Sequence, residues 1–131
     1  LVNELAPRVH NSGHLTIEAS LTSQFENHLL AICGLPLGDT GSTSPALMFN
    51  LLGEMPACAG QPVFDEPTNE SIHWHDYRKT PRSGRKIGHV TVTANTQAGL
   101  QARAALLAAE LGVAAELDLE MVLQAVGKQA E

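Results

Sequence analysis

Functional side chains are concentrated in one short stretch near the start of the chain. Within seven positions lie a carboxylate, Glu4, a guanidinium, Arg8, and an imidazole, His10. A carboxylate can hold a hard cation such as Mg²⁺ through oxygen, a guanidinium can bind an oxyanion through two hydrogen bonds, and an imidazole can transfer a proton near neutral pH. In an extended segment these alternate residues would share one face. The cluster therefore indicates an active-site loop rather than three unrelated surface contacts.

Basic side chains are concentrated in a second stretch, in which no acidic residue intervenes. It holds five of the eight basic residues of the chain: Arg78, Lys79, Arg82, Arg85 and Lys86. Because the net charge of the whole chain is −6, this stretch is a cationic spot on an acidic body. Such a spot suits a small anionic ligand such as a phosphate and suits a nucleic-acid backbone poorly, since the remaining surface would repel it. Charge alone favours a solvated loop without a ligand, because short basic runs are common.

Two further patterns leave alternatives open. His73 and His75 alternate, so their imidazoles would lie on one face of a strand, either as half of a metal site or as structural polar contacts. Trp74 and Tyr77 could stack on a nucleobase or pack at the rim of a core. For both pairs the structural interpretation is favoured, because no third metal ligand is evident and aromatic residues are common in cores.

Composition limits the classes of protein that need to be considered. The chain has 131 residues, of which 44% are hydrophobic and 17% charged, which is enough for one ordinary core and too apolar for a disordered chain. The apolar runs are too short for a membrane span. Cys33 and Cys58 make a poor disulfide framework, so we expect a cytoplasmic protein. The chain opens on Leu1 within an alternating segment, from which we expect a C-terminal piece of a longer protein.

The hydrophobic pattern predicts an α+β fold. Apolar residues spaced by three and four indicate a helix over 15–33, which Gly34 and Pro36 would end. An Ala/Leu-rich helix is predicted over 97–111 and a weaker, acidic one over 117–126. Alternating or short apolar runs predict four strands, at 1–5, 46–53, 72–77 and 87–93. The basic residues 79–86 would form the hairpin-like connection between the last two strands.

Several motifs resemble one enzyme family. They are NELAPRVHNSGH at 3–14, TSQFENH at 22–28, CGLPLG at 33–38, NLLG at 50–53, YRK at 77–79 and RKIGH at 85–89. Together they are similar to the C-terminal part of 5-(carboxyamino)imidazole ribonucleotide synthases, the ATP-grasp ligases of purine biosynthesis. The resemblance implies that residues 1–37 close an ATP-grasp domain and that 38–112 form a small β-rich lobe with a C-terminal helix. Residues 113–131 lie beyond the resemblance, and their pattern predicts an acidic helical tail.

The resemblance also implies a reaction and a set of ligands. In this family ATP phosphorylates bicarbonate, and the carboxyphosphate then carboxylates the amine of 5-aminoimidazole ribonucleotide. Glu4 matches the magnesium-binding glutamate, so Mg²⁺ is the implied metal. Arg8, His10 and Asn11 match the residues around bicarbonate and carboxyphosphate, with His10 as the candidate proton acceptor.

The basic stretch is the other implied contact with substrate. Lys79 and Arg85, with Lys86 beside them, match the family's contacts to the ribonucleotide phosphate. We expect no nucleic-acid or membrane partner, whereas the missing N-terminal part of the same enzyme is an expected partner and a homodimer is possible. Without that part the fragment would be inactive. The alternative is a non-catalytic module that binds a phosphorylated small molecule.

Overall fold

The computed structural model describes residues 5–60 and 72–113 of the chain. The helix predicted over 117–126 lies entirely outside these ranges. Most of the strand predicted at the start of the chain, including Glu4, also lies outside them. Leu5, the last residue of that predicted strand, is not in a strand. In the described residues no helix is both long and apolar enough to cross a membrane.

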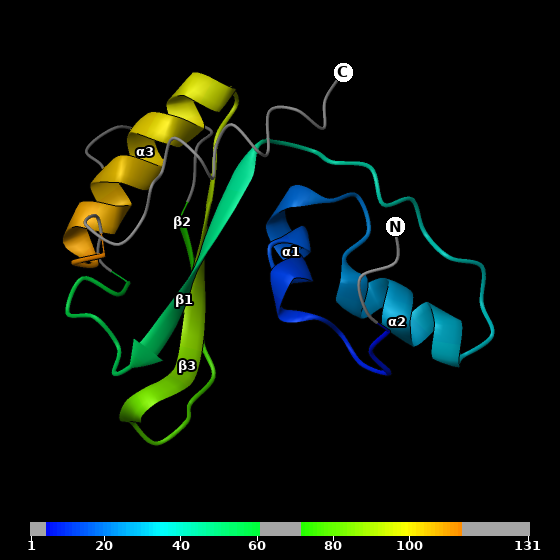
Figure 1. Ribbon diagram of the computed structural model, residues 1–131. Coiled ribbons are helices and arrows are strands. Elements are labelled where there is room, and N and C mark those ends of the chain that lie inside the picture. Colours follow the sequence, from blue (N-terminus) through cyan, green and yellow to red (C-terminus); the bar gives the residue numbers. More distant parts are fainter. Residues whose placement is uncertain (1–4, 61–71, 114–131) are drawn as a thin grey trace.

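Three antiparallel strands form one sheet with the longest strand in the middle (Figure 1). The edge strands β1 (Ala46–Gly53) and β2 (Ile72–Asp76) both pair with β3 (Arg82–Thr93). These strands and the helices around them confirm the predicted α+β class. The prediction for the start of β3 was wrong, because the strand reaches back to Arg82 into the basic stretch. The register against β1 shifts there, with Leu52 opposite Lys86 and Gly53 opposite Arg82, so a bulge absorbs residues predicted as loop.

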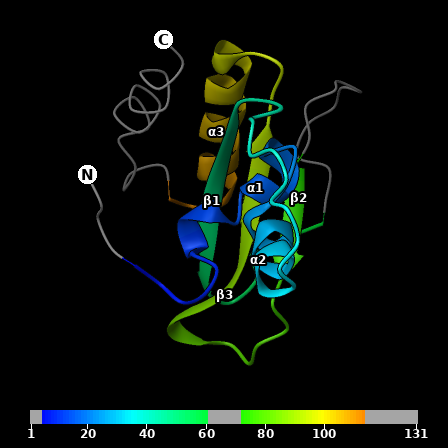
Figure 2. The ribbon, with the colours of Figure 1, turned by 90° about the vertical axis from the view of Figure 1, so that its right-hand side faces the viewer.

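One face of the sheet is apolar and is covered by α3 (Gln97–Glu110) (Figure 2). The Thr96 hydroxyl caps the helix by accepting from the Gly99 backbone N–H at 3.0 Å, and Gly112, with a φ of 70°, ends it. The buried residues between helix and strands make the main core: Phe49, Leu51, Val90, Val92, Ala94, Leu100, Ala104, Leu107 and Ala108. This helix was predicted over nearly the same residues.

The opposite face of the sheet is polar. Because side chains alternate along a strand, His89 and Thr91 of β3 point away from α3, and both are buried. His75 and His73 of β2 lie directly opposite them in the register. The N-terminal helices cover this side of the sheet, so the molecule has three layers (Figures 1 and 2).

The single helix predicted over 15–33 was wrong, since the segment forms α1 (Thr16–Ala19) and α2 (Gln24–Ile32). Ser20 between them is extended and bridges to Ser42, and the Leu21 N–H donates to the Gly41 carbonyl at 2.9 Å. The Ser23 hydroxyl then restarts the helix by accepting from the Glu26 N–H at 3.2 Å. Ser23 and Glu26 have the spacing of a capping box, the sequence signal that marks this break.

The apolar side of these two helices is largely exposed. Leu29 is 62% and Ile32 68% exposed, and Leu21 is exposed as well, although their spacing had predicted a buried face. Phe25 is the better covered residue of this apolar side, because its ring centroid lies 4.9 Å from that of His14. Within the described residues, no partner buries the rest of this face.

The core between α3 and the sheet generates the first prediction. Leu107 is fully buried, whereas its neighbour Leu106 is 56% exposed. We expect Leu107→Ala to lower the free energy of unfolding by about 2–5 kcal/mol, since it removes buried methyl groups and leaves a cavity. Leu106→Ala is the matched control and should change it by less than about 0.5 kcal/mol. Urea unfolding measures both, and equal losses would contradict this placement of the core.

Candidate functional site

Three imidazoles meet where the polar face of the sheet contacts the N-terminal segment. The rings of His75 and His89 are stacked, with centroids 4.2 Å apart and planes 13° apart. The ring of His14, from the loop before α1, lies 5.5 Å from that of His89. We call these three residues the histidine cluster.

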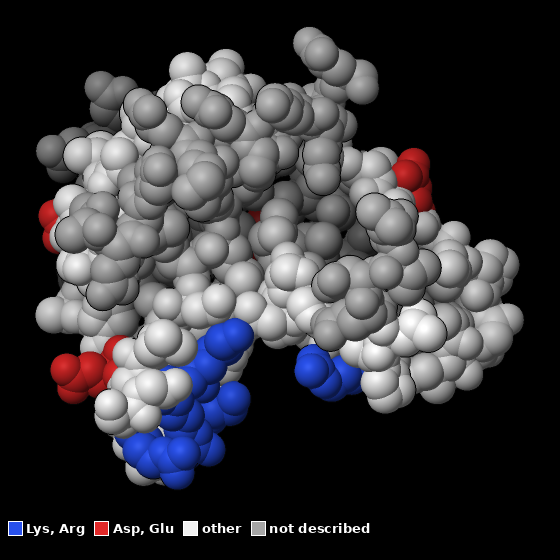
Figure 3. All heavy atoms as spheres, viewed as in Figure 1, with Lys and Arg blue, Asp and Glu red and all other residues white. Residues whose placement is uncertain are grey.

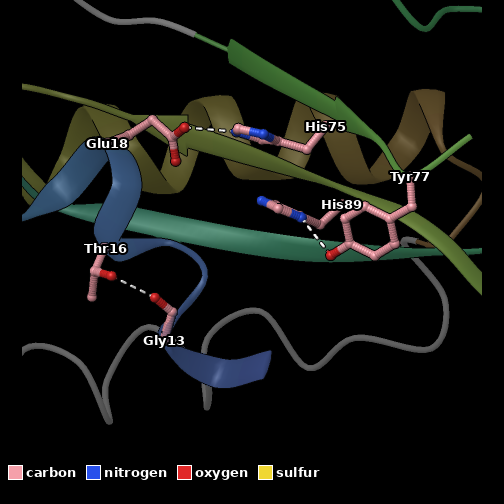
Figure 4. A network of polar contacts seen from close by, with 6 residues as sticks. All are labelled: Gly13, Thr16, Glu18, His75, Tyr77 and His89. Atoms are coloured by element: carbon pink, nitrogen blue, oxygen red, sulfur yellow. Dashed lines mark hydrogen bonds and ion pairs between the residues drawn. The ribbon is translucent and has the colours of Figure 1, made fainter. Parts of the chain in front are cut away.

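Two short polar contacts extend the cluster on both sides (Figure 4). On one side, Oε1 of Glu18 in α1 lies 2.7 Å from Nε2 of His75. On the other, the hydroxyl of Tyr77 lies 2.7 Å from Nδ1 of His89, within hydrogen-bonding distance. Nε2 of His89 is buried and has no hydrogen-bond partner among the described residues.

Burial keeps most of the cluster uncharged at neutral pH. Burial, together with the charge of Lys86 and the neighbouring imidazoles of His75 and His14, lowers the pKa of His89 to about 4. Burial also lowers the pKa of His14 and raises the pKa of Tyr77. His14, Tyr77 and His89 are therefore neutral hydrogen-bonding groups at pH 7.

The N-terminal loop is held in shape by one glutamine side chain. Oε1 of Gln24 accepts from the His10 backbone N–H at 2.9 Å, and its Nε2 donates to the His10 carbonyl at 2.7 Å. The second hydrogen of Nε2 faces Nδ1 of His14 at 2.8 Å. A Cβ on Gly13 would lie only 2.7 Å from Oε1 of Gln24, so a side chain there would displace this amide. Gln24 thus ties the loop to the histidine cluster.

The predicted catalytic residues lie together on this loop. Arg8 and His10 are exposed, with the Arg8 guanidinium donating to the Val9 carbonyl at 3.1 Å and Nδ1 of His10 lying 2.8 Å from the Ser12 hydroxyl. Asn11 is partly buried, and its side-chain oxygen has no hydrogen-bond partner among the described residues. Glu4, the predicted metal ligand, lies outside the described residues.

The basic stretch forms a positive surface at one end of the sheet, visible below β1 and β3 in Figure 3. The Lys79 ammonium lies 4.9 Å from the centroid of the Tyr77 ring and 3.5 Å from the Lys86 carbonyl. The Arg85 guanidinium donates to the Thr80 carbonyl at 3.3 Å. The charge of Lys86 lowers the pKa of both His14 and His89. The cluster thus bridges the loop that carries the predicted catalytic residues and the predicted phosphate-binding residues.

The sequence interpretation missed this cluster as a unit. His73 and His75 had been considered as half of a metal site, but His75 instead pairs with Glu18. Among the residues that the structure describes, no group of three or more histidine, cysteine or acidic side chains could hold a metal ion. The sequence signal that could have predicted the cluster is the alternation in IHWHDY at 72–77. It places His75 and Tyr77 on the same face of the sheet as His89.

Two family models match the chain. The model of the ATP-grasp domain matches residues 1–25, and that of the phosphoribosylaminoimidazole carboxylase C-terminal domain matches residues 46–103. Over 113 residues the chain is 50% identical to the N5-carboxyaminoimidazole ribonucleotide synthase of Vibrio cholerae. The chain matches the C-terminal part of N5-carboxyaminoimidazole ribonucleotide synthases. This confirms the resemblance that the motifs at 3–14 and 85–89 had indicated.

Solved synthases share this fold. The synthetase of Thermus thermophilus superposes with a TM-score of 0.71 at 48% identity, over 81% of this chain and 28% of that one. The synthase of Aspergillus clavatus, solved with ADP and 5-aminoimidazole ribonucleotide, gives a TM-score of 0.63 at 37% identity, over 79% of this chain and 29% of that one. The match to the Vibrio cholerae synthase covers 85% of this chain and 28% of that protein. The chain therefore spans a little over a quarter of its synthase relatives and corresponds to their C-terminal part.

The buried histidines generate a prediction for stability. Unfolded, His89 would bind a proton near pH 6.5, but in the folded chain it does so only near its lowered pKa of about 4. Between these values the unfolded state binds more protons, so stability is fully present above pH 6.5 and falls as the pH is lowered towards 4. The loss that His89 contributes is about 3 kcal/mol, and the lowered pKa of His14 acts in the same direction.

Urea unfolding of the chain at pH 7 and pH 4.5 measures this loss, and His89→Asn should reduce the difference between the two pH values. His28→Asn is the matched control, because His28 is an exposed residue of α2 away from the cluster. A wild-type difference that survives His89→Asn unchanged would contradict a neutral, buried His89.

Proposed function

We propose that this chain is the C-terminal part of an ATP-dependent ligase that carboxylates 5-aminoimidazole ribonucleotide with bicarbonate. The observation that carries the proposal is the convergence of the 8–14 loop and the basic stretch on the histidine cluster. The match to N5-carboxyaminoimidazole ribonucleotide synthases and the ligands of the Aspergillus clavatus synthase support the choice of substrates. The nucleotide-binding part of such an enzyme would precede this chain.

The basic stretch would bind the ribonucleotide phosphate. Lys79, Arg85 and Lys86 supply ammonium and guanidinium donors on an end of the sheet where the structure shows a positive surface (Figure 3). Charge-assisted hydrogen bonds to phosphate are among the stronger polar contacts in proteins. The ribonucleotide's amine would then face the loop that carries Arg8 and His10.

The loop would act on the carboxyl group. Arg8 would pair with the oxyanion of carboxyphosphate, which stabilises the charge that develops as the phosphate leaves. The amine nitrogen attacks the carboxyl carbon, inorganic phosphate departs, and His10 would accept the proton that the amine releases. Asn11 would direct its amide at the same group.

Magnesium would be held through Glu4, and when bound it would neutralise charge on the phosphates. Glu4 supplies one carboxylate, so the other ligands would have to come from outside the described residues. In the same proposal residues 1–37 complete an ATP-grasp domain, residues 38–112 form the small lobe and residues 113–131 an acidic helical tail. The exposed apolar face of α2 supports this division, because a larger domain would bury it.

The phosphate contacts can be tested in a complete enzyme, made by joining this chain to the upstream part of a relative such as the Vibrio cholerae synthase. We expect Lys79→Ala or Arg85→Ala to raise the KM for the ribonucleotide about 10- to 100-fold, because losing a charge-assisted bond costs about 1.5–3 kcal/mol. The KM for ATP should change much less. Arg85→Lys should not fully restore binding, since an ammonium lacks the two-pronged geometry of guanidinium.

Arg103→Gln is the control, because Arg103 belongs to α3 on the other side of the sheet. Steady-state kinetics with varied ribonucleotide at saturating ATP decide the matter. An equal rise in the KM values for both substrates would indicate misfolding. Unchanged KM values for both would mean that the basic stretch is a solvated surface that binds no phosphate.

Comparing ADP release by the 131-residue chain with ADP release by the complete enzyme distinguishes catalysis from ligand binding alone. We expect the 131-residue chain alone to release no ADP from ATP in the presence of bicarbonate, whereas the complete enzyme should do so. Coupled detection of ADP measures both. Bicarbonate-dependent ADP release by the chain alone, at the rate of the complete enzyme, would overturn the proposed division of labour. Ribonucleotide binding without turnover in the complete enzyme would favour the non-catalytic module.

A further inference from the structure

A continuous series of contacts runs from α1 to the basic stretch. It begins at the Glu18 carboxylate, which lies 2.7 Å from His75. His75 stacks on His89 at 4.2 Å, and Nδ1 of His89 is hydrogen-bonded to the Tyr77 hydroxyl at 2.7 Å. The series ends where the Tyr77 ring faces the Lys79 ammonium at 4.9 Å. Figure 4 shows its first four members side by side.

The series is rigid at one end and open at the other. The Glu18 side chain is 7% exposed, and His89 is 2% exposed. Packing of this kind holds side chains in single rotamers. His75 is 30% exposed, Tyr77 is half-buried and Lys79 is exposed, so Lys79 is the member most open to a ligand in solution.

Lys79 is the member that most needs to be held in place. A lysine side chain is long and flexible, and fixing it on a ligand costs conformational entropy. Here its ammonium is restrained by the face of Tyr77, through a cation–π contact, and by the Lys86 carbonyl at 3.5 Å. The ring can restrain it only if the ring itself is fixed, and the hydrogen bond from the Tyr77 hydroxyl to buried His89 fixes it.

We propose that Glu18, His75, His89 and Tyr77 form a positioning relay that holds the Lys79 ammonium ready for the phosphate of a ribose-phosphate ligand. None of the four needs to touch the ligand. The identity of the ligand rests on the proposed function, but the relay is a property of the described contacts. Glu18 lies in the segment that matches the ATP-grasp domain, and the other three lie in the segment that matches the C-terminal domain. The relay therefore joins the two matched segments at the phosphate-binding residue.

Tyr77→Phe is the cleanest test, because it removes one oxygen atom and leaves the ring under Lys79. In the complete enzyme we expect it to raise the KM for the ribonucleotide about 2- to 10-fold, the range for one hydrogen bond. Both kcat and the KM for ATP should stay near the wild-type values. A residue with a merely structural role would change all three.

A double-mutant cycle tests whether Tyr77 acts through Lys79. If it does, Tyr77→Phe combined with Lys79→Ala should bind the ribonucleotide no worse than Lys79→Ala alone. Effects that multiply in the double variant would overturn the relay, as would a Tyr77→Phe enzyme identical to the wild type.

Rescue at His89 provides a second test. His89→Asn retains an oxygen that can accept from Tyr77 near the place of Nδ1, whereas His89→Leu offers no acceptor. The asparagine variant should therefore have a lower ribonucleotide KM than the leucine variant, with His28→Asn as the control outside the relay. Equal KM values for the two His89 variants would contradict the role given to this hydrogen bond.

Failure of the proposed function would look different from failure of the relay. If the wild-type complete enzyme makes no carboxylated ribonucleotide, the proposed function fails. The double-mutant cycle of Tyr77→Phe and Lys79→Ala is then measured in the 131-residue chain, as its affinity for ribose 5-phosphate by NMR titration. A weakening by Tyr77→Phe that disappears in the Lys79→Ala background supports the relay. Independent effects of the two substitutions, or no weakening by Tyr77→Phe, overturn it.

Discussion

The contact between Glu18 and His75 is the interaction on which the arrangement of this chain depends. The two residues are far apart in sequence, and their atoms meet at 2.7 Å across the boundary between α1 and the sheet. The Glu18 carboxylate is nearly buried there, and an unpaired buried charge would be costly. The pair therefore fixes how the N-terminal segment sits on the polar face of the sheet.

The other polar contacts follow from that placement. Because α1 packs on the sheet, His14 lies against the stacked pair of His75 and His89. The Gln24 side chain is hydrogen-bonded to both His14 and the His10 backbone, so it fixes His10 relative to the cluster. At the other end of the cluster, Tyr77 and Lys86 bring the basic surface to the same place. His89 is neutral in this packing, because burial lowers its pKa to about 4. The loop and the basic stretch are thus linked through the polar interior of the molecule.

Sequence patterns predicted the parts of this fold that local physics determines. The short apolar run at 46–53, the alternation at 72–77 and the Ala/Leu-rich segment before Gly112 correspond to β1, β2 and α3. The break at Ser20 was missed because the capping signal at Ser23 and Glu26 was overlooked, and the bridge from Ser20 to Ser42 joins residues distant in sequence. Separation in sequence also explains why the imidazoles at 14, 75 and 89 were not grouped, since strand register and the docking of α1 bring them together. The family was recognised because its motifs are contiguous, whereas the roles of Arg8, His10, Asn11, Glu4, Lys79, Arg85 and Lys86 stay predictions.

The central claim is that the histidine cluster holds the N-terminal loop and the basic stretch as two sides of one site. A crystal structure of the complete enzyme with 5-aminoimidazole ribonucleotide tests it most directly. We predict the phosphate within hydrogen-bonding distance of the Lys79 ammonium and the Arg85 guanidinium, the amine turned toward His10, and Tyr77 still bonded to His89. A ribonucleotide bound elsewhere, with its phosphate on upstream residues and neither the loop nor the basic stretch in contact with it, would contradict the claim.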